Sequence, residues 1–480
     1  MKTAAQLGLA TAILVAAQCS AQRLPQDAPP AGPRPASTHD WTRFGWDAGR
    51  SSAPSAPMGI TAANVDSLVR MQVPLGGTVD ASAIYLHGVT VKGVTRDVFI
   101  LTTTYGKTLA IEPDSGKVLW EFTPPGYAGF AGTYRITTAT PVADPDRQFI
   151  YAAAPDGMIR RLAVADGSVA WSTPITKLPA REKIASPLNY WHARVIATTG
   201  GYVGDAPPYQ GHVAVLDAAS GRFLHVWNAL CSDTAGLLTP ANCTQSDAAI
   251  WGRAGAVVDT TTGDLFVATG NGLWDGKTNW GDATLALDSL ATTLLGNYTP
   301  TNTAQLNATD ADLGSTSPVL LGAGLIAQGG KDGLIRLLAW SGYQGSAAHQ
   351  GGETQTVSTP SGTDLFTAPA VWRNGTTTWL FAADNGGTAA WTLTGGRLVQ
   401  AWKNSVGGTS PVVADGLLFV YAPSGGLYVY DAPSGKQLAD LPTGSGHWNS
   451  PIVVDGMIAL PEGNANRHRT SGVLDIWRVR

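Results

Sequence analysis

The sequence has 480 residues, of which 44% are hydrophobic and 14% charged, and its formal net charge is −4. The abundance of Gly (57 residues) and Trp (16 residues) with so few charges excludes a coiled coil and a chain that is disordered throughout. No basic surplus exists that would indicate a nucleic-acid-binding protein.

Residues 1–21 are typical of an export signal. Lys2 precedes an apolar stretch from Leu7 to Ala17, and the small residues of Cys19-Ser20-Ala21 suit cleavage. The apolar stretch is too short to cross a bilayer as a helix, and no later segment resembles a transmembrane helix. We therefore expect a periplasmic or secreted protein. A lipidated Cys19 is the less favoured alternative, because Gln18 stands where a small residue is normally found.

Residues 22–40 are rich in Pro, Ala and Gln and predict a flexible leader. In the remaining domain, residues 41–480, a short pattern of a small residue, then Pro or Ala, then an aliphatic residue returns eight times. Its copies are Ser82-Ala83-Ile84, Thr140-Pro141-Val142, Ser186-Pro187-Leu188, Gly255-Ala256-Val257, Ser317-Pro318-Val319, Ala368-Pro369-Ala370, Ser410-Pro411-Val412 and Ser450-Pro451-Ile452. They recur about every 50 residues, the length of a four-stranded propeller blade.

Each copy predicts four strands, the last of which follows a Gly turn and ends in Trp. In the first copy the turn is Asp114-Ser115-Gly116 and the Trp is Trp120, which we expect to pack against the next blade. The final copy, from Asn449, supplies only three strands, whereas residues 67–74 form an unpaired outer strand. Pairing the two chain ends would remove the exposed edges. The sequence thus predicts an all-β protein with a single eight-bladed β-propeller of four-stranded antiparallel blades, closed by N- and C-terminal strands; seven blades are the fallback.

Two cysteines, Cys231 and Cys243, lie twelve positions apart in a loop-like stretch. In an oxidising compartment, a disulfide is the expected state. The alternative, a pair of metal ligands, lacks the usual partner His residues.

The repeat, with Ala110-Ile111-Glu112-Pro113-Asp114-Ser115-Gly116 and Trp120, resembles the tryptophan-docking repeat of the quinoprotein alcohol dehydrogenase superfamily. The lead-in Trp41-Thr42-Arg43-Phe44-Gly45-Trp46-Asp47 is similar to the N-terminus of that family. The superfamily includes dehydrogenases that use pyrroloquinoline quinone (PQQ) and also the non-enzymatic assembly factor BamB. The resemblance covers roughly residues 40–480 and therefore implies the propeller more directly than it implies catalysis.

The resemblance also implies where PQQ and Ca²⁺ would bind. Asn271, in Ala268-Thr269-Gly270-Asn271, matches the calcium-binding Asn of the family, although a turn Asn is the alternative. Lys331, in Gly329-Gly330-Lys331-Asp332-Gly333, matches the cation near the quinone oxygens, or else it is a solvent-facing turn residue. Trp251 lies near the stacking position of the family, but it is offset by two residues, and Arg253 holds the position aligned by spacing.

Two departures from the family pattern stand against ordinary PQQ chemistry. Tyr202 occupies the position of a calcium-ligating Glu, so that Asp205, three residues later, is the nearest metal-ligand candidate. Thr309 occupies the position of the catalytic base when Asp312 is aligned with the second Asp of the motif. Either Asp310 or Asp312 would then act as the base, unless both are turn residues.

Two functional hypotheses follow. In the first, the chain is an exported PQQ- and calcium-dependent oxidoreductase that acts on a small or polymeric alcohol, like the alcohol or polyvinyl alcohol dehydrogenases, or is a degenerate relative of them. In the second, it is a non-catalytic scaffold similar to BamB, whose loops contact a protein partner.

Overall fold

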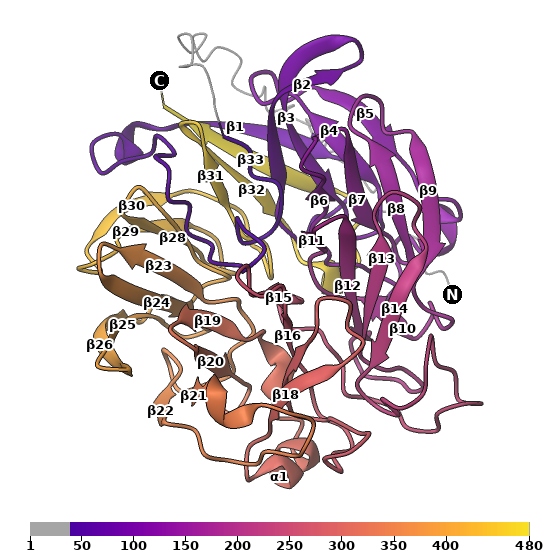
Figure 1. The fold of residues 1–480 in the computed structure, drawn as a ribbon. Coiled ribbons are helices and arrows are strands. Elements are labelled where there is room, and N and C mark those ends of the chain that lie inside the picture. The colour runs from indigo at the N-terminus through magenta and orange to yellow at the C-terminus, as the bar shows by residue number, and fades with distance from the viewer. Residues whose placement is uncertain (1–38, 480) are drawn as a thin grey trace, which may run out of the picture. The chain divides into compact units, whose positions relative to one another are not determined.

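Each repeat copy folds into a small antiparallel sheet, and the eight sheets stand around a common axis as the blades of a propeller (Figure 1). The computed structural model describes residues 39–479. The expected signal peptide, including Cys19, and residues 22–38 of the expected leader lie outside the described residues. Within residues 39–479, no helix has the length and apolar character needed to span a bilayer. The predicted all-β, eight-bladed architecture is confirmed, and the seven-bladed fallback is wrong.

The first four blades follow one another along the chain. Blade 1 contains β2 (Ile84–Val91), β3 (Val94–Thr102), β4 (Thr108–Ile111) and β5 (Val118–Phe122). Blade 2 contains β6 (Val142–Ala143), β7 (Phe149–Ala153), β8 (Met158–Ala163) and β9 (Val169–Pro174). Blade 3 contains β10 (Glu182–Ile184), β11 (Asn189–Trp191), β12 (Arg194–Gly201), β13 (His212–Asp217) and β14 (Phe223–Asn228). It has five strands because both β10 and β11 pair with β12. Blade 4 contains β15 (Val257–Val258), β16 (Leu265–Ala268), β17 (Thr284–Leu287) and β18 (Leu294–Tyr298).

The last four blades complete the ring. Blade 5 contains β19 (Val319–Gly322), β20 (Leu325–Gly329), β21 (Leu334–Ala339) and β22 (Gln355–Ser358). Blade 6 contains β23 (Ala370–Asn374), β24 (Thr377–Ala383), β25 (Thr388–Thr394) and β26 (Arg397–Asn404). Blade 7 contains β27 (Val412–Ala414), β28 (Leu417–Tyr421), β29 (Leu427–Asp431) and β30 (Gln437–Leu441). Blade 8 contains β31 (Ile452–Val454), β32 (Met457–Glu462), β33 (Gly472–Arg478) and, from the other end of the chain, β1 (Val69–Leu75). The helical segments are α1 (Thr303–Ala308), η1 (Val65–Ser67), η2 (Tyr127–Gly129), η3 (Leu313–Ser315), η4 (Trp340–Tyr343) and η5 (Ala465–Arg467).

The small residue that opens each repeat copy joins one blade to the next near the axis. The Ser82 N–H donates to Oγ1 of Thr140 (3.1 Å), and the Ala368 N–H donates to Oγ of Ser410 (2.9 Å). The Ser450 hydroxyl in turn donates to the Ser410 carbonyl (2.8 Å). A small hydroxyl residue fits the narrow space near the axis. Its hydroxyl forms hydrogen bonds with backbone groups that are not paired between the strands of a sheet. This bonding gives a physical reason for the small hydroxyl residue in several of the copies.

The tryptophan that ends an outer strand docks on the neighbouring blade. The Trp120 indole N–H donates to the Val164 carbonyl (2.8 Å), and a Cβ on Gly167 would lie 2.6 Å from the Trp120 ring. Gly is thus required in that hairpin turn both for its positive φ and for the ring that covers it. The predicted packing is confirmed. The equivalent bonds are those from Trp171 to Ala218 (3.1 Å) and from Trp402 to Ala432 (2.9 Å).

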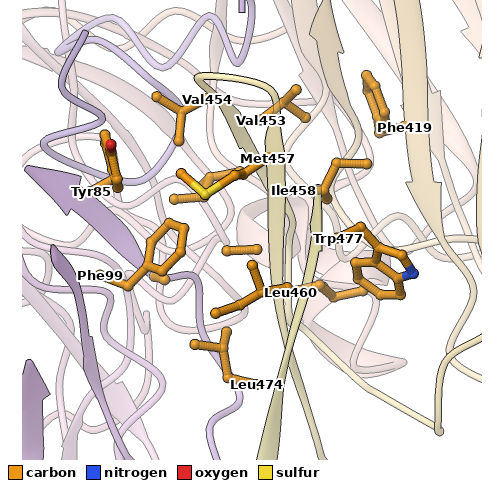
Figure 2. Packing of buried hydrophobic residues seen from close by; sticks show 14 of the residues in the cluster. Tyr85, Phe99, Phe419, Val453, Val454, Met457, Ile458, Leu460, Leu474 and Trp477 are labelled. Carbon is orange, nitrogen blue, oxygen red and sulfur yellow. The ribbon is translucent and has the colours of Figure 1, made fainter. Parts of the chain in front are cut away.

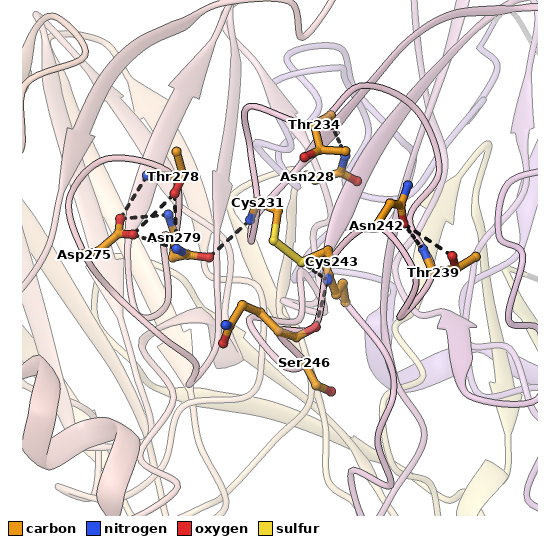
Figure 3. The surroundings of a disulfide bond; sticks show 12 residues. Asn228, Cys231, Thr234, Thr239, Asn242, Cys243, Ser246, Asp275, Thr278 and Asn279 are labelled. Atoms are coloured by element: carbon orange, nitrogen blue, oxygen red, sulfur yellow. Dashed lines mark hydrogen bonds between the residues drawn. A yellow bond between two sulfur atoms is a disulfide. The ribbon is translucent and has the colours of Figure 1, made fainter.

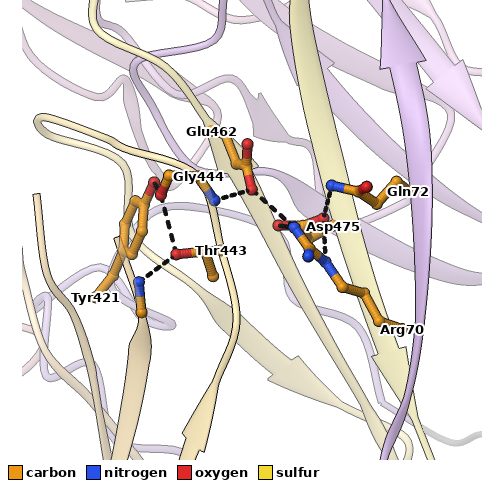
Figure 4. Close-up of polar contacts among 8 residues, drawn as sticks. Arg70, Gln72, Tyr421, Thr443, Gly444, Glu462 and Asp475 are labelled. Carbon is orange, nitrogen blue, oxygen red and sulfur yellow. Dashed lines mark hydrogen bonds and ion pairs between the residues drawn. The ribbon is translucent and has the colours of Figure 1, made fainter. Parts of the chain in front are cut away.

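Strand β1 closes the ring by pairing antiparallel with β33, as the unpaired strand at residues 67–74 predicts. Buried side chains of blades 1, 7 and 8 pack together behind this closure, among them Phe99, Phe419 and Trp477 (Figure 2). On the other side of the joint, the Arg70 guanidinium binds both carboxylate oxygens of Asp475, each at 2.8 Å (Figure 4). The two chain ends are therefore held by a strand ladder, an apolar core and an ion pair.

The segment 41–58 closes one end of the axis by bonding to the first strands of many blades. Carbonyl groups of this segment accept N–H groups in or directly after those strands: Thr42 from Ala143, Ala48 from Val258, Ser51 from Val371, Ser52 from Val413 and Met58 from Gly456. The first strands begin at the opposite end of the axis, where the pocket described below lies.

The predicted disulfide joins Cys231 and Cys243 in the connection between blades 3 and 4 (Figure 3). Cys243 also packs on Gln210, whose side-chain N–H lies 2.9 Å from its sulfur. Gln210 directly follows Tyr209, a residue of the axial pocket described below. The disulfide therefore lies next to the segment that carries Tyr209.

Replacing both cysteines by Ser is expected to lower the free energy of unfolding by at most about 3 kcal/mol, because the bond closes only a short loop in the unfolded chain. Urea unfolding monitored by tryptophan fluorescence measures the loss. Reductant should destabilise the wild-type protein by a similar amount and leave the Cys231→Ser, Cys243→Ser variant unchanged. An effect of reductant on that variant would contradict this interpretation.

Candidate functional site

A pocket of about 720 Å³ lies on the axis, at the end where the first strands begin. Its walls come from blades 3, 4, 5, 6 and 8. The lining includes Lys183, Tyr202, Asp205, Tyr209, Trp251, Asn271, Asp310, Asp312, Lys331, Phe366 and Trp448. The pocket therefore brings together Asn271, Lys331, Trp251, Asp205, Asp310 and Asp312, which the sequence singles out as site candidates.

The acid–base groups of the pocket meet around Lys331, in the turn between β20 and β21. The Lys331 ammonium forms ion pairs with Asp310 (3.0 Å) and with Asp312. The other carboxylate oxygen of Asp312 accepts the N–H of Asn271 at 2.6 Å. Asp312 is 3% exposed, whereas the Asp310 side chain is 66% exposed. Asp312 is thus the fixed carboxylate of this cluster, and Asp310 lies at its rim.

Burial shapes the electrostatics of these groups. It raises the pKa of Asp312, although Lys331 and the Asn271 N–H lower it. Burial alone would lower the pKa of Lys331, but Asp312 and Asp310 together raise it above its ordinary value. The ammonium is therefore charged at neutral pH, and Asp312 is a stronger base than an exposed Asp.

A second buried carboxyl group, Asp282, holds the Asp312 loop from behind. Its Oδ1 accepts the N–H of Leu313 (3.0 Å), directly after Asp312, and its Oδ2 has no hydrogen-bond partner within the described structure. Burial raises the pKa of Asp282 to about 7. Asp282 therefore positions the loop without facing the pocket.

The floor of the pocket is aromatic. The Trp251 ring lies 5.8 Å from Trp448 and 5.9 Å from Phe366, measured between ring centroids. The Lys331 ammonium stands 5.5 Å from the Trp251 centroid, and the Lys183 ammonium stands 5.1 Å from that of Trp448. The Trp251 ring is tilted by 35° against Trp448 and by 41° against Phe366, so a flat ligand would stack on one ring face and meet the neighbouring rings at an angle.

Arg253, the other candidate for the cofactor floor, is not among the pocket residues. It is 2% exposed and lies beneath the floor, where its Nε donates to the Trp448 carbonyl (3.0 Å) and its Nη1 to the Thr138 carbonyl (2.9 Å). Its guanidinium is 5.2 Å from the Phe44 ring of the closing segment. Arg253 therefore supports Trp448 from below, and Trp251 is the residue that faces the pocket.

Tyr202 and Asp205 border the pocket in the loop that follows β12. The Tyr202 hydroxyl donates to the Pro179 carbonyl (2.9 Å), and burial raises its pKa to about 12, so it remains a neutral phenol. Burial also raises the pKa of Asp205, and the charge of Asp312 raises it further, whereas the Tyr209 hydroxyl lowers it. Tyr202 is thus no substitute for a carboxylate ligand, while Asp205 belongs to an excess of acidic groups.

Within residues 39–479, no cluster of three or more His, Cys, Asp or Glu side chains is arranged to hold a metal ion. A larger hollow of about 980 Å³ lies beside the closing segment 41–58. Its aspartates cap local backbone; Asp415, for example, accepts the N–H groups of Met58 and Ile60 (3.0 and 3.1 Å). The axial pocket is therefore the better candidate site.

Lys183, Phe366 and Trp448 also line the pocket but are not among the residues that the sequence motifs predict. A signal for them exists in the repeat, because Phe366 and Trp448 stand two positions before the small residue of a copy, and Lys183 stands three positions before Ser186. Residues at these positions lead into the first strands and surround the open end of the axis. An alignment of the repeat copies that includes the residues before each copy would identify Phe366 and Trp448 as pocket residues.

Comparison with known proteins adds a family and a set of related folds. The model of the family described as outer membrane protein assembly factor BamB matches residues 72–236 and 379–470, more than half of the chain. No curated protein matches the chain in sequence.

Three solved structures represent the similar folds. Quinohemoprotein alcohol dehydrogenase from Comamonas testosteroni superposes with a TM-score of 0.66 at 15% identity, over 92% of this chain and 80% of that one. A europium-containing methanol dehydrogenase superposes with a TM-score of 0.68 at 14% identity, over 92% and 98%. BamB from Moraxella catarrhalis superposes with a TM-score of 0.54 at 12% identity, over 86% and 99%. At these identities the likeness establishes a shared fold.

Proposed function

The chain belongs to the family described as outer membrane protein assembly factor BamB, within the superfamily of PQQ-like β-propellers, and we propose that its axial pocket binds PQQ with calcium to oxidise an alcohol. The observation that carries the proposal is the convergence of Asn271, Asp312 and Lys331 from different blades on one pocket with an aromatic floor. The substrate is a small or polymeric alcohol.

The pocket has the features that a flat, anionic quinone requires. Trp251 and Trp448 offer ring faces, and Lys331 offers a cation above the first of them. The ion pairs to Asp310 and Asp312 hold this ammonium in place before a ligand arrives. Quinone oxygens near Lys331 would receive a charge-assisted hydrogen bond.

Calcium fits the pocket only together with the cofactor. Asn271 and Asp205 offer an amide and a carboxylate oxygen, whereas calcium takes about six to eight oxygen ligands. Tyr202 adds none, since its hydroxyl bonds to Pro179. The excess of buried carboxyl groups favours a cation, but the remaining ligands would have to come from PQQ or water. We therefore expect calcium to bind tightly only when PQQ is present.

When bound, PQQ would supply the acceptor for the two electrons and the hydrogen that leave the alcohol carbon. Asp312 would take the proton of the alcohol hydroxyl, because its carboxylate is held in one orientation and its pKa is raised. Lys331 would polarise the oxygen at which negative charge develops. Asp310, at the exposed rim, would help to keep Lys331 in its charged form, because it raises the pKa of the ammonium.

The proposal also places the protein outside the cytoplasm, with residues 1–21 as its signal peptide and residues 41–480 as its propeller domain. The disulfide between Cys231 and Cys243 supports an oxidising compartment.

Adding PQQ and Ca²⁺ to the purified protein tests the proposal. At a hundredfold excess over the dissociation constant, bound ligand should raise the free energy of unfolding by about 2.7 kcal/mol, measured as a rise in melting temperature. The quinone absorbance should remain with the protein after dialysis. Ca²⁺ alone should have little effect.

Two variants sharpen this test. Lys331→Met should weaken PQQ binding at least about tenfold, since hydrogen bonds to charged groups contribute roughly 1.5–3 kcal/mol. Lys436→Met changes an exposed lysine in a hairpin turn and should bind PQQ like the wild-type protein. If PQQ produces no shift at any calcium concentration, the oxidoreductase proposal is wrong, and the second hypothesis, a BamB-like scaffold with a protein partner, takes its place. Tyr202 favours that alternative, because it stands where the dehydrogenases have a calcium-ligating Glu and its hydroxyl bonds to Pro179 instead.

A further inference from the structure

Lys183 is a buried lysine in the wall of the axial pocket that has no role in the acid–base cluster. It lies on β10, next to the floor residue Trp448, and is 4% exposed. Among residues 39–479, no carboxylate forms an ion pair with its ammonium, and Asp80 and Asp205 act on it only at longer range. Within the described part of the chain, Lys183 is therefore a pocket cation that no carboxylate contacts directly.

The nearest candidate counterion, Asp80, is already saturated. Its carboxylate accepts the N–H groups of Trp448 (2.7 Å) and Ala465 (3.0 Å) and pairs with the His447 ring (2.7 Å). Burial lowers the pKa of Lys183 to about 8, which leaves the ammonium largely charged at neutral pH. A buried charge without a partner is unfavourable unless an anion or water approaches it. The pocket is the side from which such a group can come.

The two ends of the aromatic floor thus differ in charge. At the Trp251 end, Lys331 is neutralised by Asp310 and Asp312. At the Trp448 end, no carboxylate of residues 39–479 forms an ion pair with the Lys183 ammonium. A planar ligand that stacks on one of these tilted rings and reaches the other would place an anionic group at the second end and its uncharged reacting group at the first.

We propose that Lys183 anchors a carboxylate of a planar aromatic ligand that extends from Trp448 to Trp251, and so directs the opposite edge of the ligand toward Lys331 and Asp312. The identity of that ligand as PQQ rests on the proposed function. Lys183 is a positioning and specificity residue, because it selects ligands that carry a carboxylate and sets their orientation in the pocket.

Binding measurements with matched ligands test this inference without turnover. The probes are PQQ and its trimethyl ester, each titrated in the presence of Ca²⁺ and followed by quenching of tryptophan fluorescence. Lys183→Met keeps the length and removes the charge, and Lys436→Met is the exposed control. We expect Lys183→Met to weaken PQQ binding by about 10- to 100-fold, as for a lost charge-assisted bond, and to leave binding of the ester unchanged. Its melting temperature without ligand should be equal or higher, because a buried charge is removed.

The outcomes separate this inference from the proposed function. If wild type and Lys183→Met bind PQQ equally, Lys183 is not the anchor, although the PQQ proposal stands. If the wild-type protein binds no PQQ but binds naphthalene-2,6-dicarboxylate, and Lys183→Met loses that binding, the anchor is supported while the PQQ proposal is wrong. If the wild-type protein binds neither compound, both are overturned.

Discussion

Replacing Asp312 by Asn is expected to lower the alcohol-oxidising turnover of the PQQ-loaded protein by about 10²- to 10⁴-fold, the usual contribution of a positioned general base. Asn has nearly the same shape and keeps an oxygen that can accept the Asn271 N–H, but it cannot take a proton. Steady-state oxidation of a primary alcohol with an artificial electron acceptor measures the loss. PQQ binding, measured separately, shows whether the loss lies in chemistry or in affinity.

Asp310→Asn is the matched control, because it changes a carboxylate that pairs with the same lysine. Asp310 is mostly exposed, and among residues 39–479 it forms an ion pair with Lys331 alone, at 3.0 Å. We expect less than about a tenfold loss of turnover from this variant, since exposed ion pairs contribute little. A larger loss from Asp310→Asn than from Asp312→Asn would assign the base to Asp310 and contradict our assignment. The sequence alone leaves these two residues as alternatives.

The sequence predicts the fold well because each blade of a propeller has the same physical requirements, so the same residue types recur along the chain. Each copy needs a small residue at the axis, as Ser82 and Ser410 show, and a glycine under a docked tryptophan, as Gly167 shows. The closing strand is equally predictable, because a final copy with three strands leaves an edge that must pair. What the sequence does not reveal is irregular structure, such as the additional pairing of β10 in blade 3 or the path of segment 41–58 beneath the blades.

The site is predicted only in part, because its residues are of two kinds. Asn271, Lys331 and Asp312 stand in short motifs that resemble a family pattern, and all three line the axial pocket. The floor depends on packing across the ring, which no local motif encodes. Arg253 shows the difference, since spacing alone makes it a floor residue, while the structure buries it beneath Trp448.

Replacing Arg70 by Met is expected to lower the free energy of unfolding by about 3 kcal/mol, because it leaves the carboxylate of Asp475 buried without its counterion. Asp475 is fully buried, and Arg70 also reaches Glu462 at 3.0 Å (Figure 4). This loss is at the lower end of the range expected when a buried ion pair is broken, because the Arg70 side chain is 25% exposed. Urea unfolding at neutral pH measures it. The matched control is Arg96→Met, which breaks an ion pair to the partly exposed Glu112 within blade 1 and should cost less than about 1 kcal/mol.

The loss in Arg70→Met should also depend on pH. Burial raises the pKa of Asp475, Arg70 lowers it and Glu462 raises it, so the pKa is higher still once Arg70 is gone. A carboxyl group whose pKa is higher in the folded than in the unfolded chain stabilises the fold below its unfolded pKa and loses this contribution as the pH rises through the folded value. The difference in unfolding free energy between wild type and Arg70→Met should therefore be larger near pH 8 than near pH 5. If the difference in unfolding free energy is the same at pH 5 and pH 8, Asp475 does not take up a proton. If Arg96→Met lowers the unfolding free energy as much as Arg70→Met does, the ion pair at the chain ends contributes no more to stability than an ion pair within a blade.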